Sequence, residues 1–328
     1  MRKVLVTGGA GFVGRHVVGR LLELGDEVHC VDKLVPMTGG IAPAKWPLFS
    51  PQDYKNFNFY NEDCRDYFKR VKDTDFDYCF HLAAMVGGRL MIENNPLAVA
   101  DDLSIDAEYW QWAAKTKPGK TLCFSSSAAY PVKYQRPKGY KLLKEEMISF
   151  DQDIGMPDMS YGWAKLTCEY LAKLAFLRHG LKSIVYRPFS GYGEDQDDAY
   201  PFPSICKRIL ANKGAPVIKV WGSGRQMRDF IHIEDCVAGI LTTMDKIDDA
   251  GAVNLSTGIY TTFIEFAGLV AEVCGFSPEV SGTSDKPEGV FARAGDPTKL
   301  AELGFKYKID LRSGIERALK RYHADLNC

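Results

Sequence analysis

The chain has 328 residues, of which 46% are hydrophobic and 25% charged, and this balance is typical of a globular enzyme with a large core. Its formal net charge of −1 excludes the strongly basic surface with which many proteins bind nucleic acid or anionic membranes. No apolar stretch approaches the ~20 residues that span a bilayer, and no signal peptide is expected before the first predicted strand. The nine cysteines form no C-x-x-C pair, and the histidines do not cluster. We therefore expect free buried thiols, no metal site and a cytoplasmic protein.

Short apolar runs alternate with longer segments of helical periodicity over the first half of the chain, as is typical of βαβ units. The predicted strands are Lys3–Thr7, Glu27–Asp32, Phe57–Asn61, Tyr78–Leu82, Thr121–Ser125 and Ser183–Arg187. The predicted helices are His16–Leu24, Ser104–Lys115 and Ala164–Arg178. Continuously apolar strands need helices on both faces. The fold class is therefore predicted as α/β, with a Rossmann-type, doubly wound parallel sheet.

The pattern changes after about residue 190, where prolines and an acidic run interrupt the alternation. We expect an NAD-binding Rossmann domain over residues 1–188 and a smaller, mixed substrate-binding lobe over residues 189–328. Residues 229–258 are expected to return to the first domain, because Ala252–Leu255 is again typical of a strand.

Three glycines, Gly8, Gly11 and Gly14, stand at G-x-x-G-x-x-G spacing between the first predicted strand and a helix that begins at about Phe12. Glycine allows a sharp turn and a close approach of the backbone to a pyrophosphate, and the helix N-terminus offers free N–H groups. A purely structural turn would use the same residues. The context of an apolar strand at the start of a βαβ unit favours dinucleotide binding.

The second predicted strand ends in Asp32. A carboxylate at that position accepts hydrogen bonds from the adenosine ribose and repels a 2′-phosphate, which favours NAD over NADP. Lys33 follows directly and leaves NADP open as an alternative.

Tyr161 and Lys165 are four residues apart and lie on one face of a predicted helix. A neighbouring ammonium, together with an oxidised nicotinamide, lowers the pKa of a phenol and makes it a base for a sugar hydroxyl. A strand that runs into three serines, residues 125–127, supplies a hydroxyl to share that proton. An ordinary surface Tyr–Lys pair and a serine-rich turn are the structural alternatives.

Taken together, several motifs resemble the NAD-dependent epimerase/dehydratase family, whose members are extended short-chain dehydrogenases that act on nucleotide sugars. The motifs are TGGAGFVG at 7–14, Asp32, HLAA at 81–84, SSS at 125–127, YGWAK at 161–165 and RDFIHIEDC at 228–236. The finer match, AAMVGG at 83–88 with SSAAYP at 126–131, is similar to the branch of GDP-mannose 3,5-epimerase and GDP-fucose synthase.

The resemblance implies roles for individual residues. Ser126, Tyr161 and Lys165 would be catalytic, and a homodimer would form through a four-helix bundle. Cofactor contacts would come from Gly8, Gly11, Phe12, Val13, Gly14, Asp32, Lys33, Asp63, Cys64, Leu82, Ala83, Ala84, Tyr161, Lys165, Arg187 and Pro188. Substrate contacts would come from Val86, Gly87, Ser126, Ser127, Tyr161, Ser190, Arg228 and Arg293, the two arginines holding the diphosphate.

The sequence departs from the family pattern where related enzymes carry extra acid–base groups. Ala128 stands where the 3,5-epimerases have a cysteine, and the dehydratases have an Asp–Glu pair at the positions of Ser127 and Ala128. Ser190 replaces a usual asparagine. What remains is hydride chemistry at C4, which predicts an NAD-dependent epimerase of a GDP- or UDP-hexose. The alternatives are a 4-dehydrogenase or reductase, less favoured a 4,6-dehydratase or 3,5-epimerase, and, in a different class, a non-catalytic NAD-binding sensor.

Overall fold

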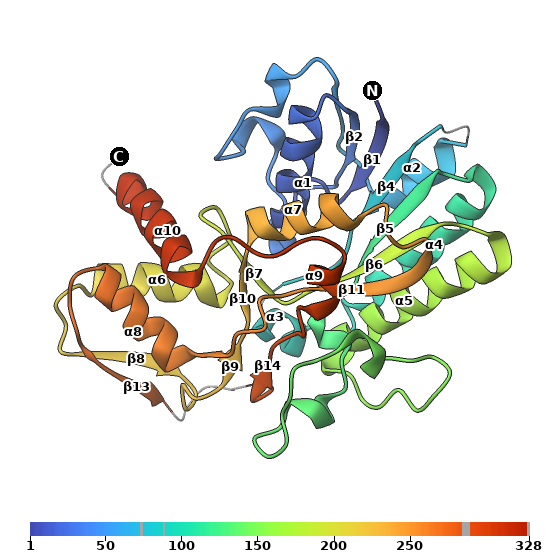
Figure 1. Cartoon of the computed structure of the whole chain (residues 1–328). Helices are drawn as coiled ribbons and strands as arrows, with labels where there is room; N and C mark the ends of the chain where they lie inside the picture. Colours follow the sequence, from blue (N-terminus) through green and yellow to red (C-terminus); the bar gives the residue numbers. More distant parts are fainter. Residues whose placement is uncertain (73–74, 88, 284–288, 327–328) are drawn as a thin grey trace. The chain divides into compact units, whose positions relative to one another are not determined.

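The computed structural model describes residues 1–72, 75–87, 89–283 and 289–326 (Figure 1). The chain divides into two compact units: unit 1 contains residues 1–129, 157–187 and 240–253, and unit 2 contains residues 130–156, 188–239 and 254–328. The chain passes between them within β6 (Ser183–Pro188), α7 (Ile233–Thr243) and β11 (Asp249–Leu255), and in two loops. Within the described ranges, no helix has both the length and the apolar character needed to cross a membrane.

Unit 1 is built on a seven-stranded sheet with the strand order β11-β6-β5-β4-β1-β2-β3. The neighbours from β6 to β3 pair in parallel. The remaining bounds are β1 (Lys3–Thr7), β2 (Glu27–Val31), β3 (Phe57–Tyr60), β4 (Tyr78–His81) and β5 (Lys120–Phe124). Each of these strands coincides with a predicted one, which confirms the α/β, Rossmann-type fold class.

The helices of unit 1 are α1 (Phe12–Glu23), α2 (Cys64–Arg70), α3 (Arg89–Asn94), α4 (Ala100–Thr116) and α5 (Met159–His179). Helix α1 begins at Phe12, as the glycine motif predicted, whereas the predicted starts at Ser104 and Ala164 were too late, because the first turns of α4 and α5 contain glycine or polar residues that do not follow the apolar period. Short 3-10 turns lie at η1 (Pro36–Thr38), η2 (Pro43–Lys45), η3 (Pro51–Asp53), η4 (Ser127–Ala129), η5 (Val132–Gln135) and η6 (Glu145–Met147).

Both faces of the sheet in unit 1 are covered. Helices α2, α4 and α5 pack side by side on one face, where Leu5 of β1 joins an aromatic cluster (Figure 1). The cluster includes Tyr67, Phe68, Tyr109, Trp110 and Trp112. Val4 and Val6 point to the opposite face and are also fully buried. The eight cysteines within the described residues are buried free thiols, in line with the expected burial.

Unit 2 is the mixed lobe, with three small sheets and five helices wholly or partly within it among the described residues. Its strands are β7 (Ser190–Tyr192), β8 (Val217–Trp221), β9 (Met227–Arg228), β10 (Phe230–His232), β12 (Thr261–Thr262), β13 (Glu279–Thr283) and β14 (Ala292–Arg293). Besides α7, its helices are α6 (Pro201–Ala211), α8 (Phe263–Val273), α9 (Thr298–Glu302) and α10 (Leu311–Leu326).

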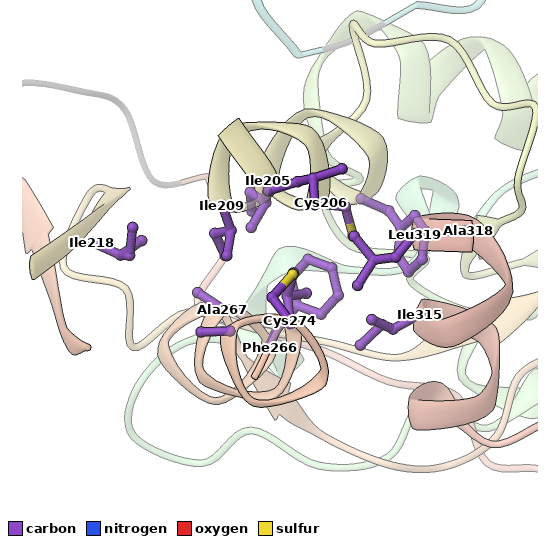
Figure 2. Close-up of a cluster of buried hydrophobic side chains, with 14 of the residues drawn as sticks. Ile205, Cys206, Ile209, Ile218, Phe266, Ala267, Cys274, Ile315, Ala318 and Leu319 are labelled. Carbon is purple, nitrogen blue, oxygen red and sulfur yellow. The ribbon is translucent and has the colours of Figure 1, made fainter. Parts of the chain in front are cut away.

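The core of unit 2 lies between α6, α8 and α10. Figure 2 shows Ile205 and Ile209 of α6 facing Phe266 of α8, with Ile315 and Leu319 of α10 beside them. Helix α8 starts at a fixed point, because Thr262 and Glu265 form a capping box that satisfies the first N–H groups.

Candidate active site

The turn between β1 and α1 leaves no room for a side chain at two of its glycines. Gly8 has a φ of +69°, and a Cβ there would lie 2.6 Å from the nitrogen of Ala83. A Cβ at Gly14 would lie 2.3 Å from the carbonyl oxygen of Gly8. Gly11 is less constrained, because the nearest atom to its Cβ would be 3.3 Å away. Glycine is therefore needed at positions 8 and 14 for the backbone of the turn itself.

The N-terminus of α1 is suited to bind an anion. No side chain caps this helix, and its first turn carries no acidic residue. The N–H groups of Phe12 and Val13 are thus among those that have no partner within the helix. The helix dipole adds a partial positive charge at this end. The glycine cradle and this uncapped N-terminus fit the pyrophosphate of a dinucleotide.

The backbone holds the carboxylate of Asp32, which directly follows β2. Oδ2 accepts a hydrogen bond from the Ala10 N–H at 3.0 Å, and Oδ1 accepts one from the Leu34 N–H at 2.7 Å. Burial raises the pKa of Asp32, although these two N–H groups act in the opposite direction. Each oxygen keeps a further lone pair for a hydroxyl donor, so the carboxylate fits a ribose that offers two hydroxyl groups.

The charge of Lys33 is paired with Asp63. Lys33 Nζ lies 3.1 Å from Asp63 Oδ2. Asp63 also caps α2 and binds the guanidinium of Arg65, with 2.7 Å between Nη2 and Oδ2. Hydrogen bonds from Arg65 hold the pKa of Asp63 well below its usual range, so this carboxylate stays charged. Because Lys33 has this anionic partner, it is poorly placed to hold a 2′-phosphate, which argues against NADP.

Ser126 is the serine of the 125–127 run that contacts Tyr161. The Ser126 hydroxyl accepts a hydrogen bond from the Ala128 N–H at 3.1 Å, and its proximity lowers the pKa of the Tyr161 phenol. Ser125 and Ser127 are buried, and Ser125 donates to the carboxylate of Glu169. The turn after β5 therefore leaves Ser126 as the serine closest in role to the phenol, while Ser125 binds another residue of α5.

Lys165 lies one helical turn after Tyr161, with Nζ 5.6 Å from the centre of the phenol ring. Burial raises the pKa of Tyr161, and the ammonium of Lys165 lowers it by less than burial raises it. Lys165 thus lowers the pKa of Tyr161, as predicted, but this effect alone is too small to make the phenol a phenolate. On the other side of the ammonium, Asp102 Oδ2 lies 3.6 Å from Nζ. Burial lowers the pKa of Lys165, but Asp102 and its other anionic neighbours raise it overall.

Four further residues of unit 1 were predicted to contact the cofactor or the substrate, and the structure shows the surroundings of each. Arg187 is buried, and its guanidinium binds Glu169 with 2.9 Å between Nε and Oε1 and 2.6 Å between Nη2 and Oε2. This side chain is therefore part of the core, and a backbone contact of Arg187 with the cofactor stays a prediction. Burial raises the pKa of Cys64 to about 12 and leaves it a neutral thiol. Val86 and Gly87 are half-buried in the segment after β4.

The two arginines predicted to bind diphosphate stand side by side in unit 2. Arg228 of β9 and Arg293 of β14 are register partners on neighbouring parallel strands, so their side chains leave the same face of the sheet. Arg228 Nη1 donates to the carbonyl of Val290 at 3.0 Å, and Arg293 Nε donates to Gln135 Oε1 at 2.6 Å. Two arginines that leave the same face of the sheet at neighbouring positions are suited to a diphosphate.

Asp229, next to Arg228, connects the segments that carry these arginines through hydrogen bonds. Its buried carboxylate accepts hydrogen bonds from the N–H groups of Thr257, Gly258 and Gly295, at 3.0, 3.0 and 3.2 Å. Burial raises the pKa of Asp229 to about 6. Its carbonyl accepts from the N–H of Ser190, which places that predicted residue on the adjoining strand β7.

Sequence reasoning missed the buried acids Asp102, Glu169 and Asp229. Asp102 and Asp106 are four residues apart on α4, on the same face as Tyr109 and Ala113. Two acids on an otherwise apolar helix face would have predicted buried carboxylates from the sequence. Glu169 lies on the face of α5 that carries Lys165, but its partners Ser125 and Arg187 are distant in sequence. Among the described residues no group of three His, Cys, Asp or Glu side chains is arranged to hold a metal ion.

Comparisons with known proteins identify the family of the chain. The sequence model of the NAD dependent epimerase/dehydratase family matches residues 4–256. GDP-L-fucose synthase 1 of Arabidopsis thaliana is 27% identical over 98% of this chain and 93% of that protein. The putative UDP-glucose 4-epimerase of Methanocaldococcus jannaschii is 27% identical over 96% of this chain and 97% of that protein. The structure of UDP-glucose 4-epimerase from Thermotoga maritima with UDP-glucose has a TM-score of 0.82 and 26% identity over 99% of each chain.

The family match covers the phosphate turn, the serine turn and the Tyr–Lys helix, and it confirms the predicted family, the predicted cofactor and the prediction of an enzyme rather than a non-catalytic sensor. The chain belongs to the NAD dependent epimerase/dehydratase family.

Proposed function

We propose that this enzyme is a nucleotide-sugar 4-epimerase, which oxidises C4 of a GDP- or UDP-linked hexose and returns hydride to the opposite face. The observation that carries the proposal is that Lys165 Nζ lies 5.6 Å from the Tyr161 ring while the start of α5 packs closely against the turn that carries Ser126. Bound NAD supplies the acceptor and later the donor of the hydride. The epimerase names of two relatives support reaction at C4.

In this mechanism Tyr161 moves the proton of the C4 hydroxyl. Its phenolate accepts that proton while C4 loses hydride, and the phenol returns the proton when hydride comes back to the keto carbon. Ser126, on the turn that packs against the start of α5, orients the phenol and the sugar oxygen. Lys165 supplies the positive charge that favours the phenolate.

We assign cofactor binding to unit 1 and the nucleotide diphosphate of the substrate to unit 2. Arg228 and Arg293 hold the diphosphate, because two neighbouring guanidinium groups make charge-assisted contacts to its oxygens. The nucleobase of the substrate is either guanine or uracil, since relatives are named for both GDP and UDP sugars.

Ala128 supports hydride transfer without elimination or proton exchange at C3 or C5. It is buried in the turn that carries Ser126, and a methyl group can neither donate nor accept a proton. A 4,6-dehydratase or 3,5-epimerase needs an acid–base group in addition to the phenol. The 4-dehydrogenase or reductase uses the same three residues and is the second candidate.

The experiment is to incubate the purified protein with a panel of UDP- and GDP-hexoses and to follow the sugar by NMR and reduced nicotinamide by absorbance. The proposal predicts a C4 epimer without net NADH. Accumulating NADH with a 4-keto sugar would assign the dehydrogenase instead. Tyr161→Phe is the matched control, since it removes only the phenol oxygen.

We also propose a homodimer that forms through the outer faces of α4 and α5. Three exposed apolar side chains, Trp163, Tyr170 and Leu177, recur at seven-residue steps along α5, and Leu103 is exposed on α4. This stripe is turned away from Tyr161 and Lys165 on the same helix. Seven-residue spacing is the pattern with which helices pack against one another, so a second copy of this chain is the partner that fits it.

For the location we propose the cytoplasm. All eight described cysteines are free thiols, and free thiols persist in a reducing compartment. Localisation of the tagged protein by cell fractionation tests this assignment.

A further inference from the structure

Helix α4 carries two buried carboxylates that have different partners. Asp102 and Asp106 have 1% and 3% of their surface exposed. Asp106 Oδ1 lies 3.2 Å from His81 Nε2, and that ring also contacts Thr7 Oγ1 at 2.8 Å through Nδ1. Asp102 instead faces Lys165, with 3.6 Å between Oδ2 and Nζ. Its other oxygen accepts a hydrogen bond from the Met85 N–H.

The Asp102–Lys165 pair differs from the buried Arg187–Glu169 ion pair of the same unit. Arg187 and Glu169 share two short, directed hydrogen bonds, which is the geometry of a structural clamp. The nearest donor to Asp102 Oδ2 is the Lys165 ammonium at 3.6 Å, longer than a normal hydrogen bond, and no other donor among the described residues reaches this oxygen. A buried carboxylate held in this way acts on its neighbours chiefly through its charge.

Charge counting connects Asp102 to Tyr161. An ionised Asp102 and a protonated Lys165 form a neutral buried pair, so a phenolate at Tyr161 would leave the cluster with a net negative charge. Burial raises the pKa of Tyr161 and the charge of Asp102 raises it further, whereas Lys165 and Ser126 lower it. The other titratable groups that face this cluster are Asp106, Cys168, Cys123 and Glu169. Burial raises the pKa of both thiols well above the ordinary value, so they carry no charge.

We propose that Asp102 is a positioning residue: it is the counter-ion of Lys165 and keeps Tyr161 protonated until a further positive charge enters the site. The oxidised nicotinamide ring carries one positive charge and the reduced ring carries none. Tyr161 is then a base when the cofactor is oxidised and an acid when it is reduced, as the two directions of hydride transfer require. The alternation of Tyr161 between base and acid rests on the proposed function. The effect of Asp102 on the protonation of Tyr161 does not, because it is already expected in the cofactor-free protein.

The test measures the ionisation of Tyr161 directly, without turnover. Protein labelled with 13C at the ζ carbon of tyrosine is titrated by NMR, and Tyr161→Phe identifies the Tyr161 signal. The informative variant is Asp102→Asn, because the amide oxygen still accepts from the Met85 N–H while the charge is lost. Asp106→Asn is the matched control, since it removes a buried charge one turn farther along α4, beside His81.

In cofactor-free wild-type protein, we expect Tyr161 to titrate above the ordinary value of about 10. Asp102→Asn is expected to lower that pKa by roughly one unit or more, and Asp106→Asn by clearly less. An unchanged Tyr161 titration in Asp102→Asn would overturn the proposal, and so would an equal shift in Asp106→Asn. Thermal unfolding of each variant checks that it is folded.

A second measurement needs no variant and applies even if Asp102→Asn does not fold. At about pH 8, wild-type Tyr161 is expected to be a phenol without cofactor and with NADH, and to shift toward phenolate with NAD+. A phenolate already present in the cofactor-free protein would contradict the proposal. If the titrations agree but no nucleotide sugar is converted, the proposed function fails while the role of Asp102 stands.

Discussion

Gly162 lies directly against the carbonyl oxygen of Ala128: a Cβ on this glycine would be only 2.4 Å from that oxygen. The Asp158 N–H donates to the same oxygen at 2.9 Å, so the start of α5 is bound to the turn that carries Ser126. This close approach brings Tyr161 near Ser126, whose hydroxyl lowers the pKa of the phenol. The glycine inside the Tyr–Lys motif is therefore part of the geometry of the site.

Gly162→Ala is expected to push α5 away from the serine turn. The extra methyl group has no space, so the protein should lose about 1–3 kcal/mol of stability, and turnover should fall roughly 10–100-fold. Thermal unfolding and kcat are the measurements. Gly268→Ala is the matched control on α8, where a Cβ meets nothing within 4 Å, and it should stabilise the protein by roughly 0.5–1 kcal/mol. Unchanged turnover in Gly162→Ala would show that the close approach is not needed.

Asp32→Asn should weaken NAD binding by roughly 10–100-fold, because the ribose hydroxyls lose a charged acceptor. The effect has a pH dependence. Since burial raises the pKa of Asp32, wild-type affinity is complete above that raised pKa and is lost as the pH falls through it. The loss therefore begins at a higher pH than for an ordinary aspartate, and it should be absent in the variant. Calorimetric titration with NAD at several pH values decides this, and equal affinities of the two proteins would refute the role of Asp32.

Arg228→Met should reduce the affinity for UDP or GDP by roughly 10–100-fold with little loss of stability, because it removes one of two adjacent guanidinium groups. Arg225→Met is the control, since Arg225 is exposed three residues upstream. Isothermal titration with the free nucleoside diphosphates separates binding from chemistry. Equal losses in the two variants would indicate a general charge effect rather than a diphosphate site.

Leu177→Glu should convert the proposed dimer into a monomer of 36.6 kDa, because it places a charge in the apolar stripe on α5. Light scattering coupled to size-exclusion chromatography measures the mass. Leu24→Glu, at an exposed apolar position after α1, should leave the dimer intact. A monomeric wild-type protein would contradict the proposed dimer.

The sequence was sufficient where neighbouring residues determine the structure. Apolar runs such as Lys3–Thr7 predicted strands closely, and the glycine spacing predicted the turn at Gly8 and Gly14, because both depend on local geometry. The spacing of Tyr161 and Lys165 predicted that both lie on one helical face for the same reason.

The sequence was insufficient where a contact joins distant segments. Nothing local indicates that Lys33 pairs with Asp63, that Ser125 rather than Ser126 binds Glu169, or that Asp102 faces Lys165. Long-range packing also determines the net pKa of Tyr161. Burial by other elements outweighs the neighbouring ammonium, and the residue spacing alone does not report burial.

The most direct test of the central claim is to run the reaction in D2O with the active nucleotide sugar and to examine every ring carbon of the product by NMR. Hydride that leaves and returns at C4 does not exchange with solvent, so the account predicts a C4 epimer without deuterium at any carbon and without net NADH. Deuterium at C3 or C5, or accumulation of a keto sugar, would contradict it.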